Sequence, residues 1–246
     1  MSSTRTAISS SSGKSRRRSS AWRSRRASDI KLDASGAASG IGGIERRGTA
    51  GLNYYGVASF WMRKYGTARG VLDAACQFAV EETGTAAATF QPLTKACFSE
   101  VLRATDSQME GHRFDASDLE RRVTQARDLA RAGVTGNLLK GSADAGMFLL
   151  EFESCFLASR TGRSAEADAH YLGCLERASK LPRSSWMWAL VWWARLERAK
   201  AAGELREAAV SANAMVAMAQ TSEHVPLKAL ADVLRADIHR DTAPAA

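Results

Sequence analysis

The stretch GRSAEADAHY at residues 162–171 shares its spacing with the stretch GELREAAVSA at residues 203–212. In both, alanine follows the glycine after five residues, and the position four residues further holds Tyr171 or Ala212. Apolar residues with helical spacing lie on both sides of each glycine, which is typical of a tight turn between two helices. Because the unit recurs after 41 residues, from 162 to 203, the sequence indicates stacked helical hairpins.

The composition favours an all-α fold. The 246 residues are 45% hydrophobic and include only four prolines, and alanine, the best helix former, is abundant. Strict alternation of apolar and polar residues over six or more positions is absent, so strands have little support. The length allows one sizeable domain with a tail.

We expect four hairpins and a last helix. The expected helices occupy residues 52–65, 67–82, 92–109, 118–132, 145–160, 164–180, 185–202, 204–220 and 226–239. Glycines 66, 162 and 203 are expected in three of the four turns. Ser117 and Glu120 have the spacing of a capping box, and Gly133 is the expected C-cap of the same helix. The domain boundaries follow: a disordered Ser/Arg-rich arm and linker at 1–48, the helical domain at 49–241, and a flexible tail at 242–246.

Residues 145–239 resemble the tetratricopeptide repeat family. The matching residues are Gly162, Ala167, Tyr171 and Pro182 in one unit, and Trp192, Gly203, Ala208 and Pro226 in the next. The repeat is longer than the family's usual length of about 34 residues, and the family's first-helix Leu-Gly pair is absent. The chain is therefore similar to the wider tetratricopeptide-like superfamily. This resemblance implies a right-handed superhelix of antiparallel hairpins that binds proteins, as a scaffold, an adaptor or a subunit of a larger complex.

The resemblance to tetratricopeptide repeats also implies which residues line the concave face of the superhelix, where a partner would bind. The expected partner-binding residues are Leu149, Phe152, Phe156, Arg160, Leu190, Trp193 and Glu197, with Arg160 and Glu197 at the rim. Exposed apolar grooves bind partner helices or peptides, and large aromatic residues are favoured hot spots. Two alternatives stay open: core packing, above all for Trp188 and Trp192, and a further helix of this chain that fills the groove.

The net positive charge of the chain comes from its N-terminal arm. Residues 1–28 contain eight Lys or Arg and no acidic residue, whereas the remainder holds 26 basic and 26 acidic residues. The basic cluster comprises Arg16, Arg17, Arg18, Arg23, Arg25 and Arg26, and Ser20 and Ser28 have the spacing of basophilic kinase sites. The arm fits an organellar transit peptide, nuclear targeting or nucleic-acid binding. A nucleic-acid-associated protein with the helical body as assembly module is therefore the alternative function.

Several classes of function have no support in the sequence. No run of 18 apolar residues and no signal sequence occur, so we expect an intracellular protein, most simply cytoplasmic, without a membrane partner. Cys76, Cys97, Cys155 and Cys174 lack a C-x-x-C pair and are expected to be reduced core residues. His170, Cys174 and Cys155 are a weak metal set, and the glycine-rich stretch 35–42 lacks the strand and helix that nucleotide binding needs. We therefore expect no enzyme, catalytic residue, cofactor or metal.

Overall fold

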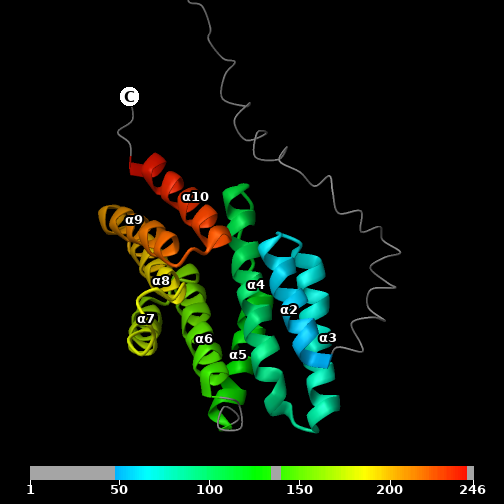
Figure 1. Ribbon diagram of the computed structural model, residues 1–246. Coiled ribbons are helices and arrows are strands. Elements are labelled where there is room, and N and C mark those ends of the chain that lie inside the picture. Colours follow the sequence, from blue (N-terminus) through cyan, green and yellow to red (C-terminus); the bar gives the residue numbers. More distant parts are fainter. Residues whose placement is uncertain (1–47, 134–139, 243–246) are drawn as a thin grey trace, which may run out of the picture. The chain divides into compact units, whose positions relative to one another are not determined.

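The computed structural model describes residues 48–133 and 140–242, and within these ranges every regular element is helical, as expected. All described residues belong to one compact unit of the chain. The elements, shown in Figure 1, are α2 (Gly48–Trp61), α3 (Tyr65–Thr83), the short 3-10 helix η2 (Ala86–Thr89), α4 (Phe90–Met109), α5 (Ser117–Arg131), α6 (Lys140–Arg160), α7 (Ser164–Ala178), α8 (Met187–Ala201), α9 (Leu205–Thr221) and α10 (Val225–Thr242).

The helices pack as successive neighbours. Each pair that is joined by a short connection is in contact: α2 with α3, α4 with α5, α6 with α7, and α8 with α9. In addition, α2 contacts α4, α4 contacts α6, and α6 contacts α8. The even-numbered helices from α2 to α8 therefore form an inner row, against which the odd-numbered helices lie. None of the described helices is both long enough and apolar enough for a membrane span.

The glycine turns predicted from the repeated spacing are present. Gly162 follows α6 with a φ of 75°, and Gly203 follows α8 with a φ of 73°. Both angles lie in the left-handed region, which glycine adopts without steric cost. Gly133 ends α5 in the same way, with a φ of 73°. At these three positions the requirement for a left-handed residue explains why the sequence pattern located the helix ends.

The predicted first turn at Gly66 is wrong. Helix α2 ends at Trp61 and α3 begins at Tyr65, so Gly66 lies inside α3. The left-handed residue of this turn is Arg63, with a φ of 60°. Its guanidinium lies 2.7 Å from a carboxylate oxygen of Asp106 on α4. A tertiary ion pair therefore accompanies a backbone conformation that a sequence pattern assigns to glycine by default.

The predicted capping box at Ser117 and Glu120 is wrong as well. The side chain of Asp115 accepts hydrogen bonds from both the backbone N–H (3.0 Å) and the hydroxyl (2.8 Å) of Ser117. The N–H of Glu120 donates instead to the carbonyl of Ala116. The hydrogen bonds from Ser117 hold the pKa of Asp115 below its usual value. Asp115, two residues before Ser117, thus accepts the hydrogen bond of a free backbone N–H at the start of α5.

Candidate functional site

The residues expected on an exposed concave face are buried. Phe152, Phe156, Leu190 and Trp193 have no exposed surface, and Leu149 and Glu197 are buried too. Arg160, expected at the rim, exposes 12% of its side chain. The prediction of an open apolar groove at these positions is therefore wrong, because other parts of the same chain cover them.

An aromatic cluster explains this burial. Phe98 of α4 lies 5.9 Å from Phe152 and 6.5 Å from Trp193, measured between ring centroids. Trp61, at the end of α2, contacts Phe98 at 5.7 Å and also His224, just before α10, at 4.8 Å. The end of α2 thus lies beside the connection between α9 and α10. The residues expected on the concave face pack between neighbouring helices of the inner row, which is the core-packing alternative.

A buried ion pair completes this closed core. The indole N–H of Trp193 donates to Glu197 Oε1 at 3.0 Å, and Arg160 Nε lies 2.7 Å from Glu197 Oε2. The Arg160 guanidinium also lies over the Phe156 ring, 5.0 Å from its centroid. Arg160 and Glu197 border a hollow of about 320 Å³. The two charges are paired with each other, one on α6 and one on α8. The pair therefore joins these two helices.

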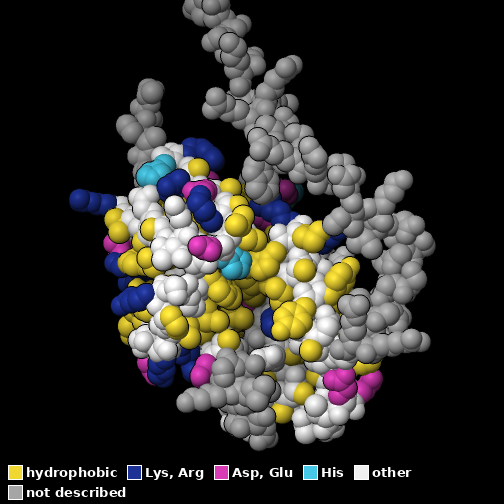
Figure 2. Space-filling view, in the orientation of Figure 1, with side chains coloured by type: hydrophobic (Ala, Val, Ile, Leu, Met, Phe, Trp, Pro, Cys, Tyr) yellow, Lys and Arg dark blue, Asp and Glu magenta, His cyan; other side chains and the backbone are white. Residues whose placement is uncertain are grey.

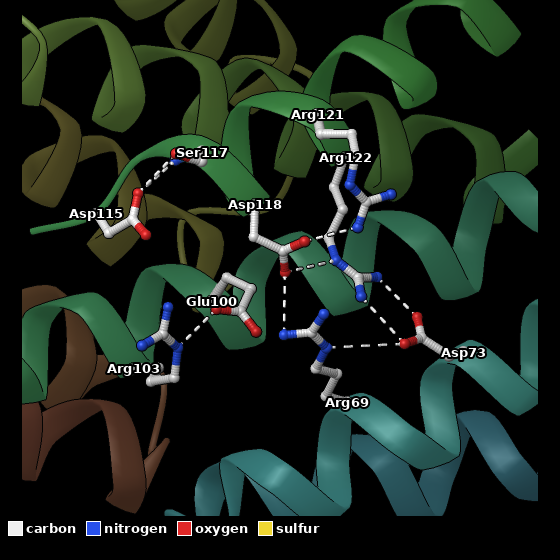
Figure 3. A network of polar contacts seen from close by, with 9 residues as sticks. All are labelled: Arg69, Asp73, Glu100, Arg103, Asp115, Ser117, Asp118, Arg121 and Arg122. Carbon is white, nitrogen blue, oxygen red and sulfur yellow. Dashed lines mark hydrogen bonds and ion pairs between the residues drawn. The ribbon is translucent and has the colours of Figure 1, made fainter.

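A second polar network joins α3 to α5 (Figure 3). Arg122 exposes only 4% of its side chain and binds both carboxylate oxygens of Asp73, at 2.7 and 3.0 Å. It also donates to Asp118 at 3.2 Å, and Arg69 lies between the two carboxylates. Burial alone would lower the pKa of Arg122, but Asp73 and Asp118 outweigh burial and raise it. The residues of this network include no nucleophile next to a base. Their charged hydrogen bonds join two hairpins, which indicates a structural role.

A polar hollow of about 490 Å³ lies between α5, α6 and α7. Inside it, His170 Nε2 lies 2.5 Å from an Nη atom of Arg127, and His170 Nδ1 lies 2.7 Å from Glu151 Oε2. Because arginine can only donate, Nε2 accepts and Nδ1 donates to the carboxylate. Both ring nitrogens are therefore engaged, so His170 is not poised as a general base.

The cysteines show the environment of core residues. Cys97, Cys155 and Cys174 are buried, and none of the four forms a disulfide. Burial raises the pKa of Cys76 and of Cys155 to about 12. A thiol that stays protonated is a poor nucleophile and a poor metal ligand. Among residues 48–133 and 140–242, no three His, Cys, Asp or Glu side chains are grouped so as to hold a metal ion.

The most unusual surface feature is the exposed face of α2. The helix GTAGLNYYGVASFW contains no charged residue, yet Tyr54 is 78% exposed and Tyr55 37% exposed. Met62, directly after the helix, is exposed as well. Figure 2 shows hydrophobic side chains gathered on the face that carries α2. We call Ala50, Tyr54, Tyr55, Ala58 and Met62, all of them exposed, the α2 face.

The inner side of α2 explains why only one face is covered. Gly56 is buried against α3, and a Cβ atom there would lie 2.6 Å from side-chain carbons of Leu72. Leu52 and Phe60 are buried on the same side. The helix carries no charge on any side, but α3 and α4 pack against only one side of it. A helix without charged residues is usually buried, so this sequence signal could have identified the α2 face.

The expectations for the basic arm lie outside the described residues. They concern Arg16, Arg17, Arg18, Arg23, Arg25 and Arg26 and the kinase-site serines Ser20 and Ser28. Comparison of the chain with known protein families, with curated proteins and with solved structures finds no match.

Proposed function

We propose that the chain is a protein-interaction module, a scaffold or subunit of a larger assembly, that binds its partner through the α2 face. The observation that carries this proposal is the 78% exposure of Tyr54 on a helix without any charge. The outer helix of a stacked helical array normally has a polar face, which keeps the array soluble. An end helix with exposed tyrosines is instead suited to a protein interface, where tyrosine is a frequent hot spot.

The packing of the helices supports the tetratricopeptide-like part of this proposal. In such arrays each hairpin contacts the next, and the first helices of successive hairpins line one side. The contacts of α4 with α6 and of α6 with α8 follow this order. The binding surface differs from the one expected from the resemblance, since Phe152 and Trp193 are buried against each other and against Phe98 of the neighbouring helix α4. The proposed interface therefore lies on α2, at one end of the array, and not on the concave face.

The proposal assigns no catalytic step to this chain. The buried thiols stay protonated, and both nitrogens of His170 are held by Arg127 and Glu151. The charged side chains of the α3–α5 network are paired with one another, which favours a structural role. These features support an interaction module over an enzyme.

Replacing both tyrosines of the α2 face tests this function. We expect Tyr54→Ser with Tyr55→Ser to weaken partner binding by about 30-fold or more, the effect of losing about 2 kcal/mol at a hot spot. Partners are captured from a lysate of the source organism, purified, and measured one to one by calorimetry. Cross-linking with mass spectrometry then locates the contact.

Leu172→Ser is the matched control, because Leu172 is 62% exposed on α7, away from the α2 face. It should leave the affinity unchanged, and circular dichroism should show that all variants are folded. A purified partner that binds the double variant as tightly as the native chain would contradict the proposal.

A second candidate function rests on the charge of the arm. Eight basic residues and no acidic residue within positions 1–28 form a cationic segment, whereas the rest of the chain has no net charge. Deleting residues 1–28 is expected to abolish binding to single-stranded RNA or DNA and the steep salt dependence that counterion release gives it. Fluorescence anisotropy with a labelled oligonucleotide at several salt concentrations checks this. Equal binding by the shortened and full chains would exclude the arm as the binding segment.

A further inference from the structure

We propose that the polar hollow between α5, α6 and α7 is a binding site for a small organic carboxylate, whose carboxylate group pairs with Arg127. The site goes beyond the proposed function and does not depend on it, because none of the residues that line the hollow belongs to α2. Three features carry the proposal: the way in which Arg127 is held, the charges that surround it, and the size and apolar wall of the hollow.

Arg127 of α5 is held in place by contacts to two neighbouring helices. Its Nε donates to the hydroxyl of Ser154 on α6 at 3.2 Å, and its Nη2 lies 2.5 Å from Nε2 of His170 on α7. Ser154 is only 1% exposed, and His170 is itself held by Glu151 at 2.7 Å. The N–H groups of Nη1 and the second N–H of Nη2 have no partner among the described residues. A carboxylate accepts two parallel hydrogen bonds from such a planar fork.

Arg127 also lacks a direct counter-charge. The other charged side chains that line the hollow each form an ion pair: Arg163 with Glu166, Arg131 with Asp128, and Glu151 with Arg177. Arg127 is half-buried, and no carboxylate of residues 48–133 and 140–242 forms an ion pair with it. Burial lowers the pKa of Arg127, although the carboxylates of Glu151 and Glu166 act in the opposite direction. A bound anion would supply the opposite charge that its neighbours do not.

The charges around Arg127 favour a ligand with a single negative charge. Glu151 and Glu166 also line the hollow, so a second negative charge on the ligand would be repelled. A carboxylate brings one negative charge, whereas a phosphate monoester brings about 1.5 to 2 at neutral pH. The hollow therefore suits a carboxylate better than a phosphate.

The hollow has room for the organic part of such a ligand. Its volume of about 490 Å³ lies in the range of about 300–1,000 Å³ that is usual for small-molecule sites. Ala130, Met147 and Leu150 give it an apolar wall beside the charged residues. An apolar wall with a few convergent polar groups is the usual composition of a ligand site. We therefore expect a carboxylate with an apolar body, such as an aromatic acid.

Benzoate is the probe that tests this site. Its binding to the full chain is measured by calorimetry in the millimolar range and at low salt, because salt screens charge pairs. Benzamide has nearly the same shape without the charge, and phenyl phosphate carries the larger charge. We expect benzoate to bind about 10-fold or more tightly than benzamide, the effect of one charged hydrogen-bonded pair, and also more tightly than phenyl phosphate. This comparison uses the native chain and does not depend on the folding of a variant.

Replacing the arginine tests its role directly. Arg127→Gln is expected to weaken benzoate binding by about 10-fold or more, because the amide lacks both the charge and the fork of donors. Arg121→Gln is the matched control: it removes a charge from the same helix, but Arg121 is exposed and does not line the hollow. It should leave the affinity for benzoate unchanged. Circular dichroism confirms that both variants are folded.

Three outcomes would overturn the proposal. They are a native chain that does not bind benzoate in the millimolar range, benzamide that binds as tightly as benzoate, and a folded Arg127→Gln chain that binds benzoate as the native chain does. Tighter binding of phenyl phosphate than of benzoate would overturn the assignment to carboxylates. None of these measurements involves the α2 face or a protein partner, so this proposal and the proposed function fail separately.

Discussion

Replacing Trp193 by alanine is expected to lower the free energy of unfolding by about 3–5 kcal/mol, the range found when a buried tryptophan is truncated in a core. The ring has no exposed surface and packs against Phe152 at 5.2 Å and Phe156 at 6.2 Å, measured between centroids. The substitution also removes the hydrogen bond to the buried carboxylate of Glu197. Urea denaturation followed by circular dichroism measures the change.

Trp192→Ala is the matched control for this prediction. Trp192 is the preceding residue of the same helix, but it is half-buried, and the Arg195 guanidinium carbon lies over its ring, 5.2 Å from the centroid. Its truncation should cost clearly less than that of Trp193. If the exposed concave face were correct, Trp193→Ala would instead lose partner binding with little loss of stability. A loss below about 1 kcal/mol at Trp193 would therefore contradict the closed core.

Glu153 is expected to make the protein less stable as the pH rises. The side chain is fully buried in α6, and neither carboxyl oxygen has a hydrogen-bond partner among the described residues. Burial raises the pKa of Glu153 well above its ordinary value, although the nearby Cys97 thiol acts in the opposite direction. The folded chain thus holds a proton that the unfolded chain releases above about pH 4.5.

The direction of the pH dependence follows from this difference in proton binding. The folded state gains from the protonated Glu153 fully below the unfolded pKa, and this gain is lost as the pH rises toward the raised folded pKa. Within that window the loss is about 1.4 kcal/mol per pH unit. Glu153→Gln removes the titrating group while keeping its shape. We therefore expect the variant to become more stable than the native chain by an amount that grows with pH.

Urea denaturation at pH 5, 7 and 8 measures this difference. Glu110→Gln, at an exposed position after α4, is the matched control and should show no such growth with pH. A constant difference between Glu153→Gln and the native chain at all three pH values would show that Glu153 is ionised in the folded state.

Local patterns in the sequence predicted the helices well because local physics decides them. The turns at Gly162 and Gly203 need a left-handed residue, and glycine supplies it at both. The first turn was predicted wrongly at Gly66, because the left-handed residue there is Arg63, whose partner Asp106 lies 43 residues away in the sequence. A tertiary contact of this kind leaves no local pattern.

The predicted binding face was wrong for a similar reason. Periodicity shows that Phe152 and Phe156 share a face of α6, but it does not show what covers that face. Phe98, which packs against Phe152, belongs to another hairpin, and the pair Trp61–His224 joins the end of α2 to the residue before α10. The Arg122–Asp73 pair likewise joins residues 49 positions apart. Which surfaces close is decided by contacts that single-sequence patterns do not contain.

The exposed tyrosines of α2 distinguish this helix from the buried aromatic core. The absence of charged residues from its sequence is typical of a buried helix. Its position at one end of the described array leaves Tyr54 and Tyr55 without a covering hairpin. The proposed binding surface therefore lies at the end of the described array, where apolar side chains stay exposed.

Hydroxyl-radical footprinting of the full chain, read residue by residue by mass spectrometry, tests the central claim that the α2 face and not the aromatic core meets the partner. The account predicts that Trp193 stays unmodified with or without the purified partner, while Tyr54 is modified readily in the chain alone and becomes protected when the partner is added. Modification of Trp193 in the folded chain at the rate of an exposed residue, together with modification of Tyr54 that the bound partner does not change, would contradict it.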